Sequence, residues 1–238
     1  SPGGPAALYS GAMSTQPAPA KPSASVVVVR DGADAIEVLM LRRNDKIAFH
    51  GGAWVFPGGR VDDADKADAA AELDIARRAA VRETLEETGL EVAVDDMLPF
   101  AHWTTPVEMP KRFATWFFAA PVVAHGEVRI DNSEIVDYRW LTPQQALAMR
   151  AAGDMELPAP TFVTLLGFAR SATIAELAAR LRAAAVQRFV PRLVPIPHGR
   201  CTLYGEDAGY ESLDFHAPGP RHRLVMHKDQ DWQYLRDF

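Results

Sequence analysis

The most informative part of the chain is the stretch Arg82-Glu83-Thr84-Leu85-Glu86-Glu87-Thr88-Gly89-Leu90. It closes an Ala-rich segment, residues 68–88, which contains no Gly or Pro and repeats apolar residues at helical spacing. This pattern predicts a helix. Gly89 is the residue expected just beyond its C-terminus, because a left-handed backbone conformation at that position ends many helices.

Three glutamates fall on one face of the predicted helix, because Glu83, Glu86 and Glu87 are spaced by three and four residues. Glu83 and Glu87 repel each other by about 0.2–0.5 kcal/mol on an exposed helix, and the helix dipole disfavours acids near the C-terminal end. Only Arg82 lies at helical spacing to offset them. A bound cation would offset the charges of the three glutamates. Clustered carboxylates suit Mg²⁺ or Mn²⁺ better than zinc. A solvated charged face is the alternative.

The residues before this helix are typical of a strand that runs into a flexible loop, Phe56-Pro57-Gly58-Gly59. Gly58 and Gly59 would let the backbone approach a bound group closely. Other strands are expected at 25–29, 36–42, 54–56, 100–104, 113–120 and 135–141, and other helices from Thr142 and over 161–170 and 173–186. Residues 188–205 regain strand character, and no element is assigned to residues 221–238.

Composition indicates a globular protein, since 48% of the 238 residues are hydrophobic and 24% are charged. A net charge of −6 argues against a nucleic-acid partner, and the apolar runs are too short to span a bilayer. A single cysteine, Cys201, excludes an intramolecular disulfide and suits a reducing compartment. We therefore expect a cytoplasmic protein with no membrane partner, and leave a homodimer open.

The chain divides into a leader and one domain. Residues 1–24 are rich in Pro, Ala, Gly and Ser, which predicts a disordered leader or a non-native extension ahead of Met13 as the start. Residues 25–238 are expected to form a single mixed α/β domain with a C-terminal helical extension.

The segment quoted first resembles the signature of the Nudix hydrolases, G-x(5)-E-x(7)-R-E-U-x-E-E-x-G-U, where U is a bulky aliphatic residue. Its second half is matched except that Thr84 takes an aliphatic position. Gly59 matches the opening glycine, and Asp74 stands where the first glutamate is expected. Nine residues are inserted between these parts, within Asp62 to Asp74, and we expect them to form a loop and an early helical turn beside the active-site mouth. The resemblance implies the Nudix fold, a mixed β-sheet sandwiched between helices.

The resemblance also implies hydrolysis of a nucleoside diphosphate linked to another moiety. The three glutamates would hold Mg²⁺ or Mn²⁺, and Arg82 would orient their carboxylates through an ion pair. Divalent ions would offset the repulsion between a diphosphate and these carboxylates. Glu134 is a further candidate ligand, since a Nudix enzyme that sanitises oxidised dGTP has a metal-binding glutamate at the same distance before a Trp, here Trp140. An exposed loop acid is an equal alternative for Glu134.

Three segments resemble the Nudix coenzyme A diphosphatases that have an interrupted signature: His102–Pro106, Arg112–Phe118 and Pro160–Phe162. Coenzyme A or acyl-coenzyme A is therefore the expected substrate, with Arg43 and Arg112 as candidates for its 3′-phosphate. A separate coenzyme A signature is only partly present, because Ala48 stands where it has Arg. NADH, ADP-ribose or a nucleoside triphosphate remain alternative substrates, and a non-catalytic Nudix-fold ligand sensor is an alternative of another class.

Overall fold

The computed structural model of the chain describes residues 18–47, 50–69, 71–122, 126–130, 132–228 and 231–237. Most of the expected leader, with Met13, lies outside these residues, as does Ala48. No helix in the described part is long and apolar enough to cross a membrane.

Strands and helices are interspersed up to α4, and only strands follow it in the part of the chain that the structure describes. The strands are β1 (Lys21–Asp31), β2 (Ile36–Arg43), β3 (Trp54–Val55), β4 (Gly58–Arg60), β5 (Leu98–Thr104), β6 (Phe113–Pro121), β7 (Ile135–Leu141), β8 (Gln187–Phe189), β9 (Arg192–Ile196), β10 (Gly199–Leu203), β11 (His222–His227) and β12 (Gln233–Arg236). The helices are α1 (Glu72–Thr88), α2 (Pro143–Ala152), α3 (Ala159–Phe168) and α4 (Ile174–Ala183), with 3₁₀ helices η1 (Asp63–Ala69) and η2 (Val94–Asp96).

The described strands form two sheets. The larger has the order β3-β2-β1-β6-β5-β8, with β4 also paired to β1 and β7 to β2. β1 runs antiparallel to β2 but parallel to β6, with Val26 opposite Phe118. The sheet is therefore mixed, as predicted.

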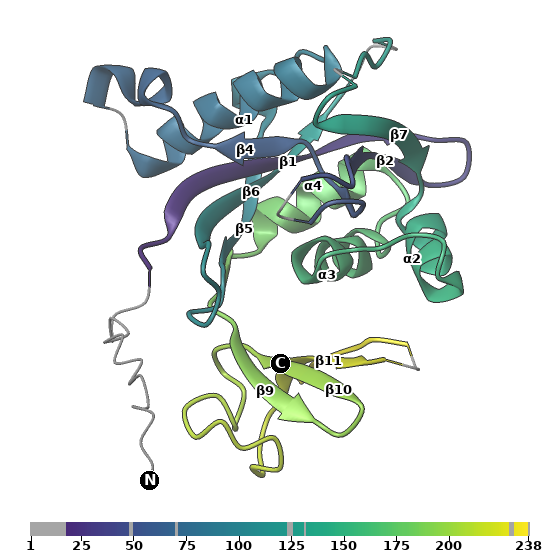
Figure 1. Cartoon of the computed structure of the whole chain (residues 1–238). Helices are drawn as coiled ribbons and strands as arrows, with labels where there is room; N and C mark the ends of the chain where they lie inside the picture. Colours follow the sequence, from purple (N-terminus) through teal and green to yellow (C-terminus); the bar gives the residue numbers. More distant parts are fainter. Residues whose placement is uncertain are drawn as a thin grey trace, which may run out of the picture.

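Helices cover both faces of this sheet, with α1 on one face and α2, α3 and α4 on the other (Figure 1). The apolar run of β1 serves both layers because successive side chains point to opposite faces. Val26 and Val28 join the core under α1, whereas Val27 and Val29 join the core on the opposite face. The predicted arrangement of a mixed sheet between helices is confirmed.

Capping residues mark the C-terminal end of α1 and the start of α2. Gly89 has φ 68° and donates its N–H to the Leu85 carbonyl, so α1 ends where the sequence predicted. α1 begins at Glu72 rather than at residue 68, because residues 68 and 69 belong to η1. Thr142 caps α2 in a reciprocal capping box with Gln145.

Two sequence predictions need correction. β1 begins at Lys21, four residues inside the expected leader, because Lys21–Ala24 pair with β6 and Ser23–Ser25 pair with β4. The C-terminal extension is helical only as far as Ala183; β9–β12 then form an antiparallel sheet of order β12-β11-β10-β9, which includes the unassigned residues after 221. The sequence indicated strand character over residues 188–205, but the prolines there and the polar residues after 221 gave no sign that these segments pair as one sheet.

The C-terminal sheet is joined to the core through aromatic contacts. Tyr204, which directly follows β10, meets Trp103 of β5 edge-on with ring centroids 5.5 Å apart, and meets Phe189 of β8 edge-on at 5.1 Å. The sheet also contains a buried ion pair between Arg223 and Asp207, at 2.6 Å. The aromatic contacts of Tyr204 hold the C-terminal sheet against the large sheet, and residues of both sheets line one cavity.

Candidate active site

A cavity of about 1080 Å³ lies beside the C-terminal end of α1. Its walls come from β1, β2 and β4, from the β5–β6 hairpin, from the segment between α2 and α3, and from β9 to β11. Arg82, Glu83, Glu86 and Glu87 of α1 all line it. The structure therefore brings the acidic helix face predicted from the sequence to the wall of this cavity.

Arg82 lies between carboxylates and contacts two of the three glutamates. Its Nη1 donates to Glu83 Oε1 at 2.9 Å and to Glu86 Oε2 at 3.2 Å. Its Nη2 donates to the Arg60 carbonyl of β4 at 3.0 Å. These bonds fix the positions of Glu83 and Glu86 and link α1 to the glycine loop.

The acidic partner of Arg82 is Asp65 of η1 and not Asp74. Arg82 Nη2 lies 2.9 Å from Asp65 Oδ2, and the Asp65 side chain is only 5% exposed. Asp74 is exposed and pairs with Arg77 at 3.1 Å. Because nine residues are inserted between the two parts of the signature, the residue eight positions before Arg82 is no longer the one that contacts it. The inserted segment lies beside the cavity, as expected, since Asp62 lines it.

Glu87 is the most buried of the three glutamates. It accepts a hydrogen bond from the Gly58 N–H at 2.9 Å. Burial raises the pKa of Glu87 to about 8. The hydrogen bond from Gly58 lowers this pKa, and the negative charge of Glu83 raises it. Burial also raises the pKa of Glu83 above its usual value.

Both predicted glycines are required by close approaches. A Cβ at Gly59 would collide with the Glu83 carboxylate. Gly58 has φ 151°, and a Cβ there would collide with the Ala24 carbonyl of β1. The loop can therefore lie directly against α1 and β1 only with glycine at these two positions.

Of the predicted residues outside α1, Glu134 and Arg43 reach the cavity and Arg112 does not. Arg43 Nη2 lies 3.9 Å from Glu134 Oε2, and both residues line the cavity. Arg112 instead donates to the carbonyls of Thr105, at 3.1 Å, and Ala18, at 2.7 Å. These bonds tie the start of β1 to the β5–β6 hairpin, so Arg112 holds backbone segments together at a distance from the carboxylates.

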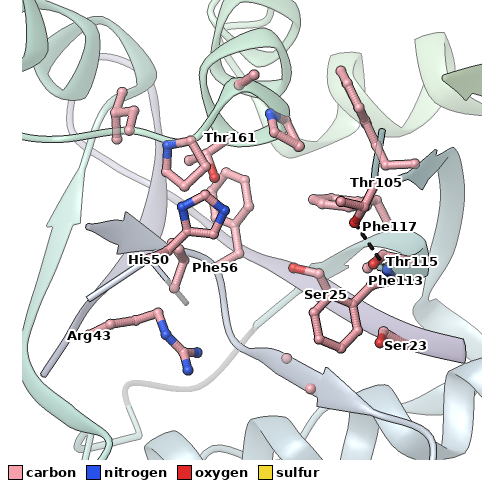
Figure 2. Close-up of a pocket in the computed structure, with 18 of the residues that line it drawn as sticks. Ser23, Ser25, Arg43, His50, Phe56, Thr105, Phe113, Thr115, Phe117 and Thr161 are labelled. Carbon is pink, nitrogen blue, oxygen red and sulfur yellow. Dashed lines mark hydrogen bonds between the residues drawn. The ribbon is translucent and has the colours of Figure 1, made fainter. Parts of the chain in front are cut away.

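The other lining residues come from distant segments of the chain. Figure 2 shows Arg43 and His50 beside Phe56 and Thr161, and across the cavity Thr105, Phe113, Thr115 and Phe117 above Ser23 and Ser25. The dashed bond runs from the Phe113 N–H to Thr105 Oγ1, at 3.0 Å (Figure 2). Arg200 and Met226 of the C-terminal sheet complete the lining. Thr105, Phe113, Thr115, Phe117 and Thr161 lie in the three segments that resemble the coenzyme A diphosphatases, whereas no sequence signal marked His50, Arg200 or Met226.

A family model described as the NUDIX domain matches residues 19–162. The chain belongs to the Nudix hydrolase family. Nudix hydrolase 7 of Caenorhabditis elegans is 28% identical over 52% of this chain and 52% of its own length. The acyl-coenzyme A diphosphatase NUDT19 of Xenopus laevis is 22% identical over 59% of this chain and 62% of its own. The chain thus spans about half of the first relative and less than two thirds of the second.

Solved Nudix structures share this fold. The crystal structure of a NUDIX hydrolase from Alicyclobacillus acidocaldarius has a TM-score of 0.61 and 22% identity, and the match covers 71% of this chain and 98% of that chain. A likeness at this identity concerns the fold alone. The β9–β12 sheet lies outside the residues that the family model matches.

Nudix hydrolases generally use divalent metal ions. Within the described ranges, no three His, Cys, Asp or Glu side chains already form a group that could hold a metal. Arg82 donates to one oxygen of Glu83 and one of Glu86, and the Gly58 N–H donates to one oxygen of Glu87, so each carboxylate keeps a second oxygen for a cation. The donor chemistry of this Nudix site fits a hard divalent cation, because Glu83, Glu86, Glu87 and Glu134 all line one cavity.

Proposed function

We propose that the chain is a divalent-metal-dependent hydrolase of a nucleoside diphosphate linked to another moiety, with coenzyme A or acyl-coenzyme A as its substrate. The observation that carries this proposal is the position of Glu83, Glu86 and Glu87 on one wall of a large cavity, against the glycine loop and Arg82. A diphosphate at this wall would meet carboxylates from α1 and the backbone of Gly58 and Gly59 at once.

The proposed ligands of Mg²⁺ or Mn²⁺ are Glu83, Glu86, Glu87 and Glu134. When bound, the cation supplies charge that offsets the diphosphate and makes an attacking water more acidic. Arg82 orients Glu83 and Glu86 through its Nη1, and the Gly58 N–H orients Glu87. Arg43, beside Glu134, is placed to contact a substrate phosphate.

The cavity supports a substrate larger than a simple nucleotide. Its volume of about 1080 Å³ is slightly above the usual range for small-molecule sites, roughly 300–1,000 Å³. One part of its lining is carboxylate and guanidinium, and another is apolar, with Phe113, Phe117 and Met226. An anionic nucleotide joined to an uncharged arm has this division, and a relative is named as an acyl-coenzyme A diphosphatase.

The test is a screen of coenzyme A, acyl-coenzyme A, NADH, ADP-ribose and nucleoside triphosphates with Mg²⁺ and Mn²⁺, in which products are identified by mass. We expect coenzyme A to give 3′,5′-ADP and 4′-phosphopantetheine with the highest kcat/KM. A higher kcat/KM for NADH or ADP-ribose would contradict the coenzyme A assignment and leave the Nudix chemistry in place.

A ligand sensor without turnover is disfavoured by the complete set of glutamates, since a sensor has no need of all three. Binding of a nucleotide with no hydrolysis of any compound in the screen would favour the sensor. A cytoplasmic location and a homodimer stay predictions.

A further inference from the structure

The C-terminal sheet adds a cation to the cavity. In β10, side chains alternate between two faces: Cys201 and Leu203 belong to the sheet's own core, whereas Arg200 and Thr202 line the cavity. Arg200 pairs in register with Met226 of β11, which also lines the cavity. The pleat of the strand therefore directs the Arg200 side chain to the cavity face of the sheet.

Arg200 lies near two other basic side chains of the cavity. Burial lowers the pKa of His50, and the charges of Arg43 and Arg200 lower it further. All three residues line the same cavity, although they come from β2, from the segment after β2 and from β10. Figure 2 shows Arg43 and His50 on the same side of the cavity.

The charge of Arg200 is not balanced by the protein that the structure describes. Arg200 is exposed and has no hydrogen bond or ion pair with a described residue, whereas two other arginines of the C-terminal sheet are paired. Arg192 lies 3.7 Å from Glu211, and Arg223 lies 2.6 Å from Asp207. Two guanidinium groups around one histidine repel each other, and an anion between them would remove that repulsion.

This basic group adjoins the carboxylates of the proposed metal site. Arg43 is common to both, because its Nη2 is 3.9 Å from Glu134 Oε2 while its charge also acts on His50. An anion bound by Arg43 and Arg200 would therefore lie next to a diphosphate held at Glu134 and α1.

We propose that Arg200, Arg43 and His50 form a subsite for a phosphomonoester that the substrate carries outside its diphosphate. In coenzyme A this group is the 3′-phosphate, an identification that rests on the proposed function. Arg200 then takes the role that we predicted from the sequence for Arg112. The C-terminal sheet, which the family model does not cover, supplies the residue that distinguishes phosphorylated from unphosphorylated substrates.

The test compares the binding of 3′,5′-ADP and 5′-AMP, measured by titration calorimetry with Mg²⁺, because neither compound contains the bond to be hydrolysed. The wild type should prefer 3′,5′-ADP by about tenfold or more, as expected of a charge-assisted contact. Arg200→Gln should reduce this preference to about threefold or less. Arg236→Gln removes the same charge from β12, outside the cavity lining, and should leave the preference unchanged.

Equal weakening of both ligands by Arg200→Gln, or no preference in the wild type, would overturn the subsite. Kinetics with coenzyme A and dephospho-coenzyme A separate this outcome from failure of the proposed function. If coenzyme A is not hydrolysed but Arg200→Gln selectively weakens 3′,5′-ADP, the subsite stands and the function fails. If coenzyme A is hydrolysed and Arg200→Gln leaves its advantage over dephospho-coenzyme A intact, the function stands and the subsite fails.

Discussion

Asp65 holds the guanidinium of Arg82 with both carboxylate oxygens: Arg82 Nη2 lies 2.9 Å from Oδ2, and Arg82 Nε lies 3.3 Å from Oδ1. Burial alone would raise the pKa of Asp65, but the hydrogen bonds from Arg82 and from the Asp62 N–H bring it below its usual value. Asp65 is therefore ionised and leaves Arg82 Nη1 to face Glu83 and Glu86. A residue of the insertion thus orients the carboxylates of α1.

Asp65→Asn should lower kcat/KM by about 10- to 100-fold, which is the usual effect of removing a residue that orients metal ligands. The concentration of Mg²⁺ needed for half-maximal activity should rise as well, because Glu83 and Glu86 lose their fixed positions. The control is Asp74→Asn, which removes an exposed partner of Arg77 and should change neither quantity. Equal activity in the Asp65→Asn and Asp74→Asn variants would contradict the role of Asp65.

Glu87→Gln should keep the fold and lose at least about 100-fold in kcat, because a neutral amide is a poorer ligand for a hard cation. The amide oxygen can still accept the Gly58 N–H, so the loop should stay in place. Hydrolysis is measured at saturating Mg²⁺ or Mn²⁺, with circular dichroism as the check on folding. Full activity in a well-folded variant would remove Glu87 from the proposed metal site.

Stability of the metal-free protein should also depend on Glu87. Its folded-state pKa of about 8 lies above the ordinary value of 4.5, so the folded protein binds the proton more tightly than the unfolded chain does. This contribution to stability is fully present below about pH 4.5 and is lost as the pH rises through about 8. At about pH 9, Glu87→Gln should therefore raise Tm by about 2–4 °C or more, and by less at about pH 6. Thermal melts in a chelator measure this, and equal shifts at both pH values would contradict it.

Gly59→Ala should lower activity by about 10- to 100-fold, because the added Cβ would collide with the Glu83 carboxylate and turn it away. Stability should change little, since the displaced group is the end of a flexible side chain. Gly167→Ala in α3 is the matched control: its Cβ would meet nothing within 4 Å, and it should keep activity and gain about 0.4–1 kcal/mol. Activity loss of the same size in both variants would contradict the collision at Glu83.

Local sequence was sufficient to predict α1 and its glutamates, because helical spacing and Gly89 act within a few residues. Asp65 was not predicted, because it reaches Arg82 from a 3₁₀ helix within the insertion, and no periodic sequence pattern marks that helix. Arg200 was not predicted because its place in the cavity depends on how Tyr204, which follows β10, meets Trp103. Arg112 was predicted in error, since sequence similarity could not reveal that its donors bind backbone carbonyls.

The C-terminal sheet should lose stability when Asp207 is replaced by Asn. The Asp207 carboxylate is fully buried, accepts from Arg223 Nε at 2.7 Å and Nη2 at 2.6 Å, and also accepts the N–H groups of His222 and Gly209. Asp207→Asn leaves the Arg223 charge buried without its partner, which should destabilise the protein by about 3–5 kcal/mol. The matched control, Glu211→Gln, removes an exposed partner of Arg192 and should change stability by about 1 kcal/mol at most.

The same ion pair should make stability depend on acid pH. Burial alone would raise the pKa of Asp207, but the bonds from Arg223, His222 and Gly209 bring it below the ordinary value of 3.8. The stabilisation is therefore fully present above about pH 3.8 and is lost as the pH falls through the lower folded-state pKa. Urea unfolding of the wild type and of Asp207→Asn should show a difference that is constant near neutral pH and narrows below about pH 3.8. A difference that stays constant into this acidic range would mean that packing, and not the charge of Asp207, stabilises the sheet.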